Sequence, residues 1–344
     1  MAIKENAIIV KNLVKNFEIS KKKQGLLGSF TSLLLPTKTT VRALKSISFN
    51  LKKGELVGFI GPNGAGKTTT MKVMSGLLYP TNGLVQVEGY DPWERKPEYL
   101  KQISLVMGQK NQLWWDLPAI ETFELNRAIY EIPKRQYEES LKELLDLLEV
   151  EDIITTQVRR LSLGQRMRLE LVASLLHKPK VLFLDEPTIG LDVVGQQQLR
   201  DFIVEYNKKY GATIMLTSHN MDDVLGLANR VIVIDKGEIL FDGELKNLTN
   251  KFAKEKTIRI SLSKKVDTKL LEKVGRVKKS EYPEYTVAVP RKTVAFAAAE
   301  ILQTLPVIDL NIEEEPIESI IRRVFRGEMI GSKSKITSKK KSKK

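Results

Sequence analysis

The chain has 344 residues, 42% of them hydrophobic and 28% charged, and a formal net charge of +14. This length accommodates one large domain and a smaller one, and no stretch reaches the roughly 18 consecutive apolar residues that a membrane-spanning helix needs. The sequence contains no cysteine, which excludes disulfides and thiol-ligated metal sites.

Near the start, three lysines at positions 21–23 precede an apolar segment, residues 25–36. Five of its side chains fall on one face of a helix: Leu26, Leu27, Phe30, Leu33 and Leu34. An apolar face beside basic residues suits a membrane surface with anionic headgroups. For this amphipathic insertion, residues 21–40, a surface helix folded onto its own domain is the alternative interpretation.

The clearest motif lies between a predicted buried strand, residues 56–60, and a predicted helix, residues 68–74. It is a Walker A loop, which consists of Gly61, Pro62, Asn63, Gly64, Ala65, Gly66, Lys67 and Thr68. Its glycines let backbone amides and the positive end of the helix, with Thr69 in the first turn, face a phosphate. We expect Lys67 to reach the β- and γ-phosphates of ATP and the Thr68 hydroxyl to ligate Mg²⁺.

A second phosphate-handling motif follows more than a hundred residues later. The apolar run 181–184 shows no alternation, which is typical of a strand covered on both faces, and it ends in Asp185 and Glu186. A carboxylate at the end of a strand can hold Mg²⁺ directly or through water, so we assign this role to Asp185. Glu186 is placed to polarise the water that attacks the γ-phosphate.

Two further regions differ in pattern from these motifs. Residues 111–160 predict helices, because apolar side chains recur every three or four residues after Pro133. Residues 256–328 predict strands and helices in the order β-α-β-β-α-β, which is the order of a ferredoxin-like sandwich, followed by a helix. This region contains no catalytic constellation.

The chain ends in a Lys-rich segment, residues 331–344, that lacks periodicity and predicts disorder. A solvated tail without a specific role and attraction to an anionic lipid leaflet both fit this composition. Nucleic-acid binding is not expected, because no aromatic side chains are interleaved to stack on bases.

From about residue 7 to residue 245 the chain resembles the ATP-binding subunit of ABC transporters. It is most similar to the branch that serves export permeases for drugs, lipids or polysaccharides. Ser162, Gly164 and Gln165 match the signature peptide, which in that family closes over the ATP held by the Walker A loop of a partner subunit. Leu163 stands where many members have glycine; we interpret it as a subfamily mark, with a plain core residue as the alternative.

The resemblance implies further roles, residue by residue. Phe17 matches the aromatic that stacks on adenine, and Asp192 belongs to the D-loop that couples the two ATP sites. Gln109 matches the Q-loop glutamine that senses Mg²⁺ and the γ-phosphate, and His219 matches the switch histidine that contacts the γ-phosphate. Gln109 and His219 thus join Glu186 as expected catalytic residues, and Gln109 also joins the expected Mg²⁺ ligands.

The resemblance implies an α/β fold: a P-loop NTPase core with an antiparallel β subdomain and a helical subdomain. We expect this ATPase domain at residues 1–250, with its helical subdomain at about 111–160, and an α+β accessory domain at 256–328. Three residues after the Q-loop are candidates for the groove that receives the permease, or are ordinary core: Trp114, Trp115 and Leu117.

The expected function is ATP hydrolysis by two copies of the chain, or by one copy with a related chain, with ATP and Mg²⁺ as cofactors. A separately encoded permease would hold the subunit at the cytoplasmic face of the cell membrane, and export is the expected direction. The alternative is a soluble ABC ATPase that acts on ribosomes, DNA or protein assemblies. A single ATPase cassette without heptad arrays or cysteine favours the transporter.

Overall fold

The computed structural model describes residues 5–21, 37–108, 110–218, 221–252, 255–315 and 317–325. Most of the amphipathic insertion, the Lys-rich tail, Gln109 and His219 lie outside the described residues. The chain divides into two compact units, Met1–Leu245 and Lys246–Lys344. No helix of the described ranges is long and apolar enough to cross a membrane.

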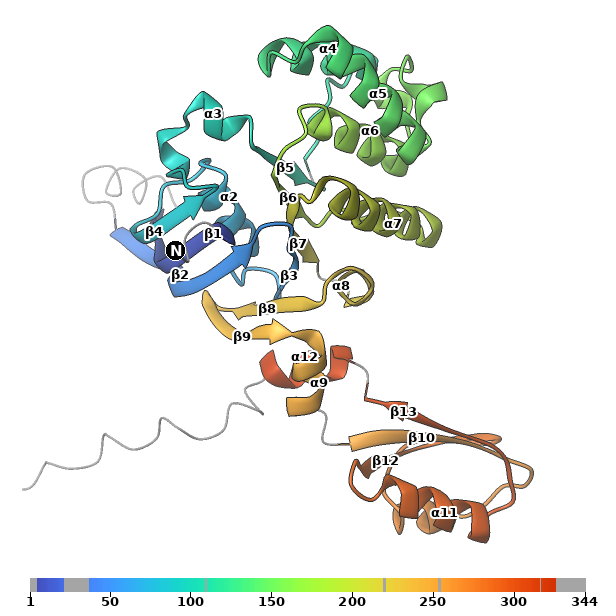
Figure 1. Cartoon of the computed structure of the whole chain (residues 1–344). Helices are drawn as coiled ribbons and strands as arrows, with labels where there is room; N and C mark the ends of the chain where they lie inside the picture. Colours follow the sequence, from blue (N-terminus) through green and yellow to red (C-terminus); the bar gives the residue numbers. More distant parts are fainter. Residues whose placement is uncertain are drawn as a thin grey trace, which may run out of the picture. The chain divides into compact units, whose positions relative to one another are not determined.

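A six-stranded sheet forms the centre of the first unit (Figure 1). Its strand order is β5-β6-β7-β3-β8-β9, and neighbouring strands are parallel except for the antiparallel pair of β8 and β9. The strands are β3 (Leu56–Ile60), β5 (Ile103–Met107), β6 (Val181–Asp185), β7 (Thr213–Ser218), β8 (Arg230–Asp235) and β9 (Glu238–Glu244).

The central strands of this sheet are covered on both faces. In β6, Leu182 and Leu184 belong to the hydrophobic core formed with the helices between residues 119 and 210, whereas Val181 and Phe183 belong to a second core on the opposite face, which includes the helix of residues 67–74. Successive side chains of a strand point to opposite faces, so an apolar run without alternation serves both cores. The prediction of a strand covered on both faces is confirmed.

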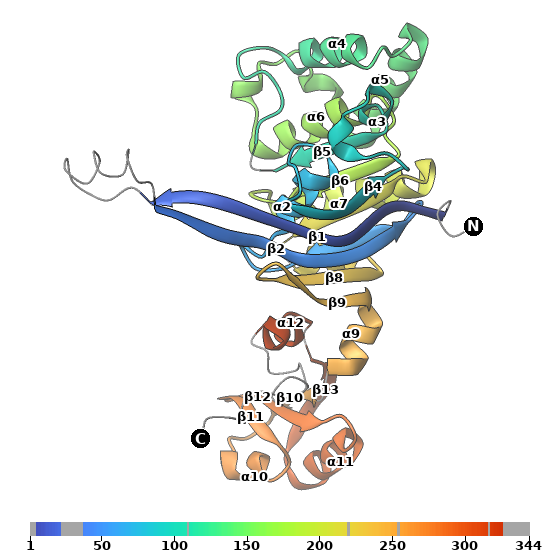
Figure 2. The ribbon, with the colours of Figure 1, turned by 90° about the vertical axis from the view of Figure 1, so that its left-hand side faces the viewer.

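An antiparallel sheet with the order β2-β1-β4 packs on the second core. The register of β1 with β4 ends at Val14, but the register of β1 with β2 continues to the pair Lys21 and Thr37. β1 and β2 therefore continue as a two-stranded hairpin beyond the end of β4 (Figure 2). The strands are β1 (Asn6–Lys21), β2 (Thr37–Lys52) and β4 (Asn82–Val87).

Helices cover the sheet and form a group of their own at the ends of β5 and β6 (Figure 1). That group includes the predicted helical region, and α5 begins directly after Pro133. Of the apolar side chains that recur after this proline, α5 buries Tyr137, Leu144, Leu145 and Leu148, and Leu141 is half-buried against the same core. The helices of the unit are α2 (Lys67–Met74), α3 (Pro97–Leu100), α4 (Ala119–Ile129), α5 (Lys134–Leu148), α6 (Leu163–Leu175), α7 (Val193–Tyr210) and α8 (Met221–Leu227).

The second unit contains a four-stranded antiparallel sheet with the order β11-β12-β10-β13. Its elements follow the order β-α-β-β-α-β, which confirms the predicted ferredoxin-like sandwich. They are β10 (Glu255–Leu262), α10 (Thr268–Glu272), β11 (Arg276–Glu281), β12 (Glu284–Pro290), α11 (Val294–Thr304) and β13 (Val307–Glu314). The flanking helices are α9 (Leu245–Phe252) and α12 (Ile317–Phe325).

One carboxylate is buried inside the helical group of the first unit. Glu170 on α6 is 1% exposed, and its Oε1 accepts a hydrogen bond from the backbone N–H of Gln112 at 3.3 Å. The Nε of Arg166 lies 3.8 Å from the same oxygen. Burial raises the pKa of Glu170 to about 7, against the weaker opposing effects of the hydrogen bond and Arg166.

This pKa makes stability depend on pH. A carboxyl with a pKa near 7 when folded and about 4.3 when unfolded costs stability as pH rises through that window, because the charged form is favoured in the unfolded chain. The quantity of interest is the unfolding free energy of Glu170→Gln minus that of the native protein. We expect this difference to increase by roughly 3 kcal/mol from pH 5 to pH 8. Urea unfolding at both pH values measures this.

Glu139→Gln is the matched control, because Glu139 lies on the exposed face of α5. Any part of the pH-dependent change in Glu170→Gln that Glu139→Gln does not reproduce then belongs to the buried carboxyl. An equal stability difference for Glu170→Gln at pH 5 and pH 8 would contradict the assigned pKa.

Candidate nucleotide-binding site

The Walker A loop connects β3 to α2, and its glycines are required by space and by backbone conformation. A Cβ atom at position 61 would lie 2.3 Å from the backbone oxygen of Ile234 on β8, which is far inside van der Waals contact. Gly66 caps α2 with a φ of 113° and provides no side-chain hydrogen bond to the helix. The first amides of α2 are therefore available to an anion, as predicted for a phosphate site.

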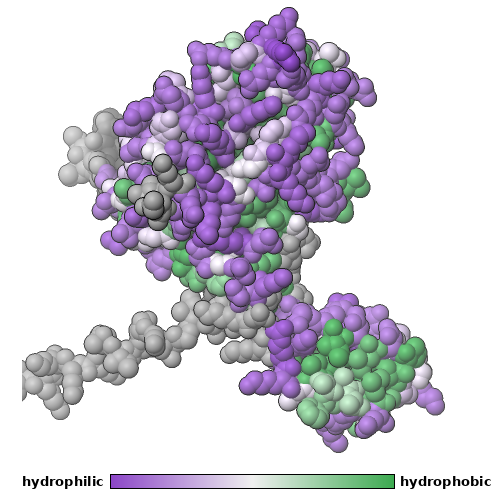
Figure 3. Space-filling model, viewed as in Figure 1, coloured by the Kyte–Doolittle hydropathy of each residue, from purple (hydrophilic) through white to green (hydrophobic). Residues whose placement is uncertain are grey.

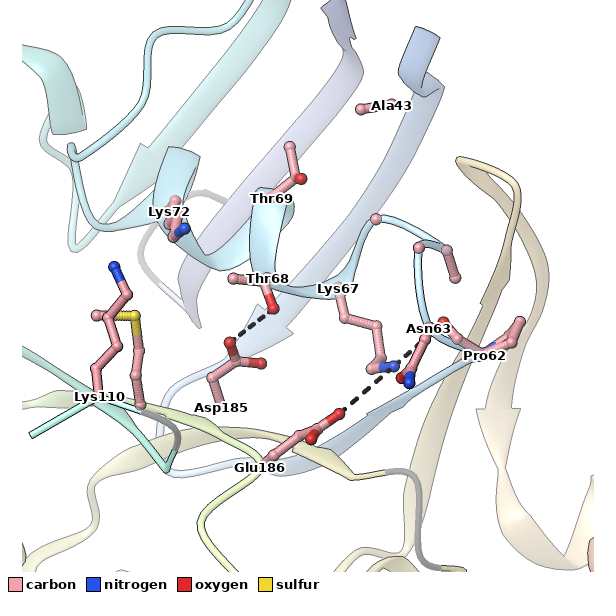
Figure 4. Close-up of a pocket in the computed structure, with 14 residues that line it drawn as sticks. Ala43, Pro62, Asn63, Lys67, Thr68, Thr69, Lys72, Lys110, Asp185 and Glu186 are labelled. Atoms are coloured by element: carbon pink, nitrogen blue, oxygen red, sulfur yellow. Dashed lines mark hydrogen bonds and ion pairs between the residues drawn. The ribbon is translucent and has the colours of Figure 1, made fainter. Parts of the chain in front are cut away.

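Lys67 points along this loop into a cavity (Figure 4). Its Nζ donates hydrogen bonds to the backbone oxygens of Gly61 at 2.6 Å and Pro62 at 3.3 Å. The same atom lies 3.9 Å from Oε1 of Glu186. Burial lowers the pKa of Lys67, while the charges of Glu186 and Asp185 act in the opposite direction. The loop thus holds the ammonium group where an incoming phosphate would meet it.

Asp185 joins the Walker A helix to the sheet. Its Oδ2 accepts a hydrogen bond of 2.7 Å from the Thr68 hydroxyl, and its Oδ1 accepts one of 2.7 Å from the Thr217 hydroxyl. A hydroxyl and a carboxylate at hydrogen-bond distance offer two oxygen ligands to a hard cation such as Mg²⁺. The donor set fits the predicted Mg²⁺ site, to which the phosphates of a nucleotide would add oxygen ligands.

Glu186 adopts a backbone conformation that is uncommon outside glycine, with a φ of 54°. Its N–H donates to both the backbone oxygen and the hydroxyl of Thr217, at 3.1 and 3.0 Å. Gly108, which precedes Gln109, packs so closely that a Cβ atom there would lie 2.1 Å from the backbone oxygen of Glu186. The start of the Q-loop is therefore tied to the residue that we expect to act as the base.

The cavity has a volume of about 420 Å³ and gathers most of the predicted ATP-binding residues. Four of its lining residues were not predicted from the sequence: Ala43, Lys72, Met107 and Lys110. Ala43 comes from β2, and Lys110 directly follows the predicted Gln109. The whole lining is Ala43, Pro62, Asn63, Gly64, Ala65, Gly66, Lys67, Thr68, Thr69, Lys72, Met107, Lys110, Asp185 and Glu186.

Phe17, the predicted adenine partner, lies on β1 and is not among the residues that line this cavity. It pairs with Val41 on β2, two residues before Ala43, which does line the cavity. Phe17 is 37% exposed, and the Nζ of Lys15 lies 5.0 Å from its ring centroid. A partly exposed ring on the strand that pairs with the Ala43 segment can offer a π-face to a base.

The signature residues form a different hollow, of about 320 Å³. Ser162 caps α6 in a capping box: its hydroxyl oxygen accepts from the N–H of Gln165 at 3.2 Å, and Gln165 Oε1 accepts from the N–H of Ser162 at 3.0 Å. Gly164 and the D-loop residue Asp192 also line this hollow. The two hollows share no residue, so the signature is not part of the Walker A cavity.

Leu163, the departure from the family's usual glycine, is the first residue of α6. This helical position does not require the positive φ that would favour glycine. The leucine packs against the core of the helical group and against Gly190, where a Cβ atom would lie 2.4 Å from Leu163 Cδ2. Gly190 has a φ of 72°, so the D-loop glycine makes room for the leucine.

A buried carboxylate that was not predicted from the sequence connects two chain segments next to the site. Asp223 on α8 is fully buried and accepts hydrogen bonds from the hydroxyls of Thr188 at 2.5 Å and Ser218 at 2.9 Å. Arg200 on α7 donates to its other oxygen at 2.8 Å. Asp223 therefore fixes the segments that follow Glu186 and precede His219.

Residues 44–189 match the protein family described as "ABC transporter", and residues 254–313 match the family "EvrA-like ABC transporter, C-terminal domain". The ABC transporter ATP-binding protein NatA of Bacillus subtilis is 31% identical over 229 residues, which cover 67% of this chain and 93% of NatA. The bacitracin transport ATP-binding protein BcrA of Bacillus licheniformis is 33% identical over 199 residues, which cover 58% of this chain and 64% of BcrA.

A solved structure of an ATP binding subunit of an ABC transporter is similar to the chain, with a TM-score of 0.59 and 25% sequence identity. The match covers 72% of this chain and 93% of that one. It confirms the predicted α/β cassette fold.

Thr217 provides a test of how the two carboxylates are positioned. Thr217→Val removes the hydroxyl that bonds both Asp185 and the N–H of Glu186 while keeping the shape of the side chain. We expect kcat for ATP hydrolysis to fall by roughly 10- to 100-fold, as for other residues that orient metal ligands, with ATP affinity nearly unchanged. Thr217→Ser retains the hydroxyl and should recover most of kcat; a Val variant with the native kcat would contradict this role.

Proposed function

Because the chain belongs to the ATP-binding subunits of ABC transporters, we propose that two copies close around ATP and drive a separate export permease. The separation of the two hollows carries this proposal. The Walker A cavity and the signature hollow share no lining residue, so the signature of one copy is free to complete the ATP site of another. The interface would be self-complementary, as in other twofold dimers.

In the proposed ATP site, the loop amides and the end of α2 bind the phosphates, and Lys67 turns from the backbone oxygens of Gly61 and Pro62 to the β- and γ-phosphates. Thr68 and Asp185 would hold Mg²⁺, which neutralises charge on the phosphates when it is bound. Phe17 would stack on the adenine, and Ser162, Gly164 and Gln165 of the second copy would close over the γ-phosphate.

Glu186 is the proposed general base, with Gln109 and His219 as its catalytic partners. Its carboxylate accepts the proton of the attacking water, and the bond from the γ-phosphorus to the bridging oxygen breaks to give ADP and phosphate. The proximity of Glu186 to Lys67, at 3.9 Å, supports this role because it puts the base beside the expected position of the γ-phosphate.

The permease is proposed to dock on the helical subdomain. Trp114 and Trp115 are 50% and 49% exposed, and Leu117 is also exposed; none of the three is core, which was the alternative for these residues. The guanidinium of Arg166 on α6 lies 5.7 Å from the ring centroid of Trp115. Exposed aromatics supported by an arginine make strong anchors for a partner.

Closure on ATP can drive the permease only because ATP binds the closed dimer more tightly than the open one. Export of a drug, lipid or polysaccharide is the proposed task, supported by the resemblance in the signature and by the similarity to a bacitracin transport protein. Contact of the amphipathic insertion or the Lys-rich tail with anionic lipid stays a prediction.

Glu186→Gln tests the proposed base. Because the amide cannot accept the proton, hydrolysis should slow by roughly 10²- to 10⁴-fold, and the ATP-bound dimer should accumulate. Steady-state turnover and sedimentation with ATP measure the two effects. Lys67→Ala is the control that should lose ATP binding and the dimer together; near-native turnover of Glu186→Gln would show that another group acts as the base.

Purification from membranes tests the transporter. The tagged chain, extracted in mild detergent, should carry a polytopic membrane protein in a stoichiometric amount. Trp115→Asp should lose that protein and keep ATP binding, because the change lies outside the ATP cavity. Ribosomes, nucleic acid or only water-soluble partners in place of a membrane protein would favour the alternative ABC ATPase. Uptake rather than export by the reconstituted complex would overturn the direction.

A further inference from the structure

The two edges of the sheet in the second unit differ in chemistry. β11 forms one edge and carries Arg276, Lys278 and Lys279, with a register shift beside Lys278. Lysines and bulges are common protections of an edge strand against pairing with another chain. β13 forms the other edge and contains neither lysine nor proline, so only its acidic residues oppose pairing there.

The helix-facing side of β13 is apolar up to this edge. Leu310 and Ile312 lie opposite Ile260 and Ile258, which are buried in the core beneath the helices. Directly paired residues point to the same face of a sheet, so Leu310 and Ile312 face the helices as well. Ile308 lies at a bulge at the start of β13 and is 67% exposed.

Helix α11 extends this apolar surface. It packs on β12 and β13 through the buried residues Ala297, Ala298 and Ile301. Its outward residues Phe296, Ala299 and Leu302 are three positions apart and therefore share one face, and Phe296 is 79% exposed. Figure 3 shows apolar residues gathered on this side of the second unit.

We propose that the second unit pairs with the second unit of another copy through β13. The two β13 strands would run antiparallel about a twofold axis perpendicular to the sheet. This joins two four-stranded sheets into one of eight strands and places both α11 helices on the same side. The partner that pairs with the β13 edge is thus a second copy of this chain.

The sequence of β13 matches itself in one register. With the axis at Leu310, this residue faces its own copy, Ile308 faces Ile312, and Asp309 faces Asn311. The three apolar residues of the helix-facing row then meet apolar residues across the seam, and no two acids lie directly opposite each other, since Glu313 faces Val307. Cross-strand pairs of this kind contribute about 0.2–1 kcal/mol each.

Neighbouring registers lack this complementarity. An axis at Asp309 places that carboxylate against its own copy, and an axis at Asn311 places Asp309 against Glu313 and Ile308 against Glu314. Like charges directly opposite each other destabilise a strand pair. The charge pattern therefore selects the axis at Leu310.

The acids at the end of β13 are already paired within the unit. The Oε2 of Glu313 lies 3.0 Å from the Nε of Arg259. The Oε1 of Glu314 lies 2.9 Å from the Nζ of Lys256 and 3.0 Å from the Nη2 of Arg291. These basic partners reduce the repulsion that two copies of the strand would otherwise experience.

Because the chain contains no cysteine, one introduced thiol can report the register. In the proposed dimer the two copies of residue 310 are directly opposite, with Cα atoms about 4.5 or 5.5 Å apart, which suits a disulfide. We expect the nucleotide-free full-length variant Leu310→Cys to form a covalent dimer under mild oxidation, detected by non-reducing electrophoresis.

Ile308→Cys is the matched control. Its two copies would be offset by four residues, or about 13 Å along the strands, which a disulfide cannot bridge. Residue 308 is the more exposed of the two positions, so random collision would favour it over residue 310. Absence of the Leu310→Cys dimer, or equal cross-linking of both variants, would overturn the proposal.

Sedimentation of the nucleotide-free chain gives a second measurement without cysteines. Ile308→Glu should weaken dimerisation at least tenfold, whereas Leu270→Glu, an exposed apolar position on α10 beside the β11 edge, should not. Equal effects of the two variants, or none from Ile308→Glu, would overturn the β13 interface. Both experiments omit ATP, so their outcome is independent of the proposed closure of the cassette.

Discussion

The carboxylate of Asp185 holds together three elements of the ATP site that are distant in sequence. It ends β6 and accepts hydrogen bonds of 2.7 Å from Thr68 on α2 and from Thr217 on β7. One side chain can do this because the carboxyl ends of neighbouring parallel strands meet at the same edge of a sheet. The next residue, Glu186, is then fixed by the same threonine, so the positions of both carboxylates depend on a single strand end.

The signature hollow is linked to this strand end through a short stretch of chain. Asp192 caps α7 by accepting a hydrogen bond of 2.7 Å from Gly195, and it follows Glu186 by six residues. Gly190, between them, contacts Leu163 at the start of the signature helix. Because Ser162 uses its hydroxyl oxygen as an acceptor within α6, its hydrogen can still be donated to an anion. In the proposed dimer, each copy would therefore provide a phosphate-binding loop for its own ATP and a hydroxyl donor for the ATP of the other copy.

The sequence predicted those parts of the molecule that local patterns determine. The Walker A loop, the buried strand before Asp185 and the β-α-β-β-α-β order of the second unit depend on glycine spacing and on apolar periodicity. Thr217 and Asp223 were missed because their contacts span 32 and 35 residues, to Asp185 and Thr188. A threonine in an apolar strand and an aspartate on a short helix carry no local signal of such roles. Likewise, the exposure of Trp114 and Trp115 depends on packing rather than on their own residue type.

In the second unit, β12 and β13 share the same apolar alternation, but their positions in the sheet leave one apolar row enclosed and the other at an edge. β12 alternates Tyr285, Val287 and Val289 on its inner face, and β13 alternates apolar residues in the same way. β12 has a neighbour on each side, so its apolar residues are fully enclosed. β13 has one neighbouring strand among the described residues, so its apolar face continues to an unpaired row of backbone donors and acceptors. The alternation predicts a strand in both cases, but only the order of the strands turns it into a surface that a second copy can extend.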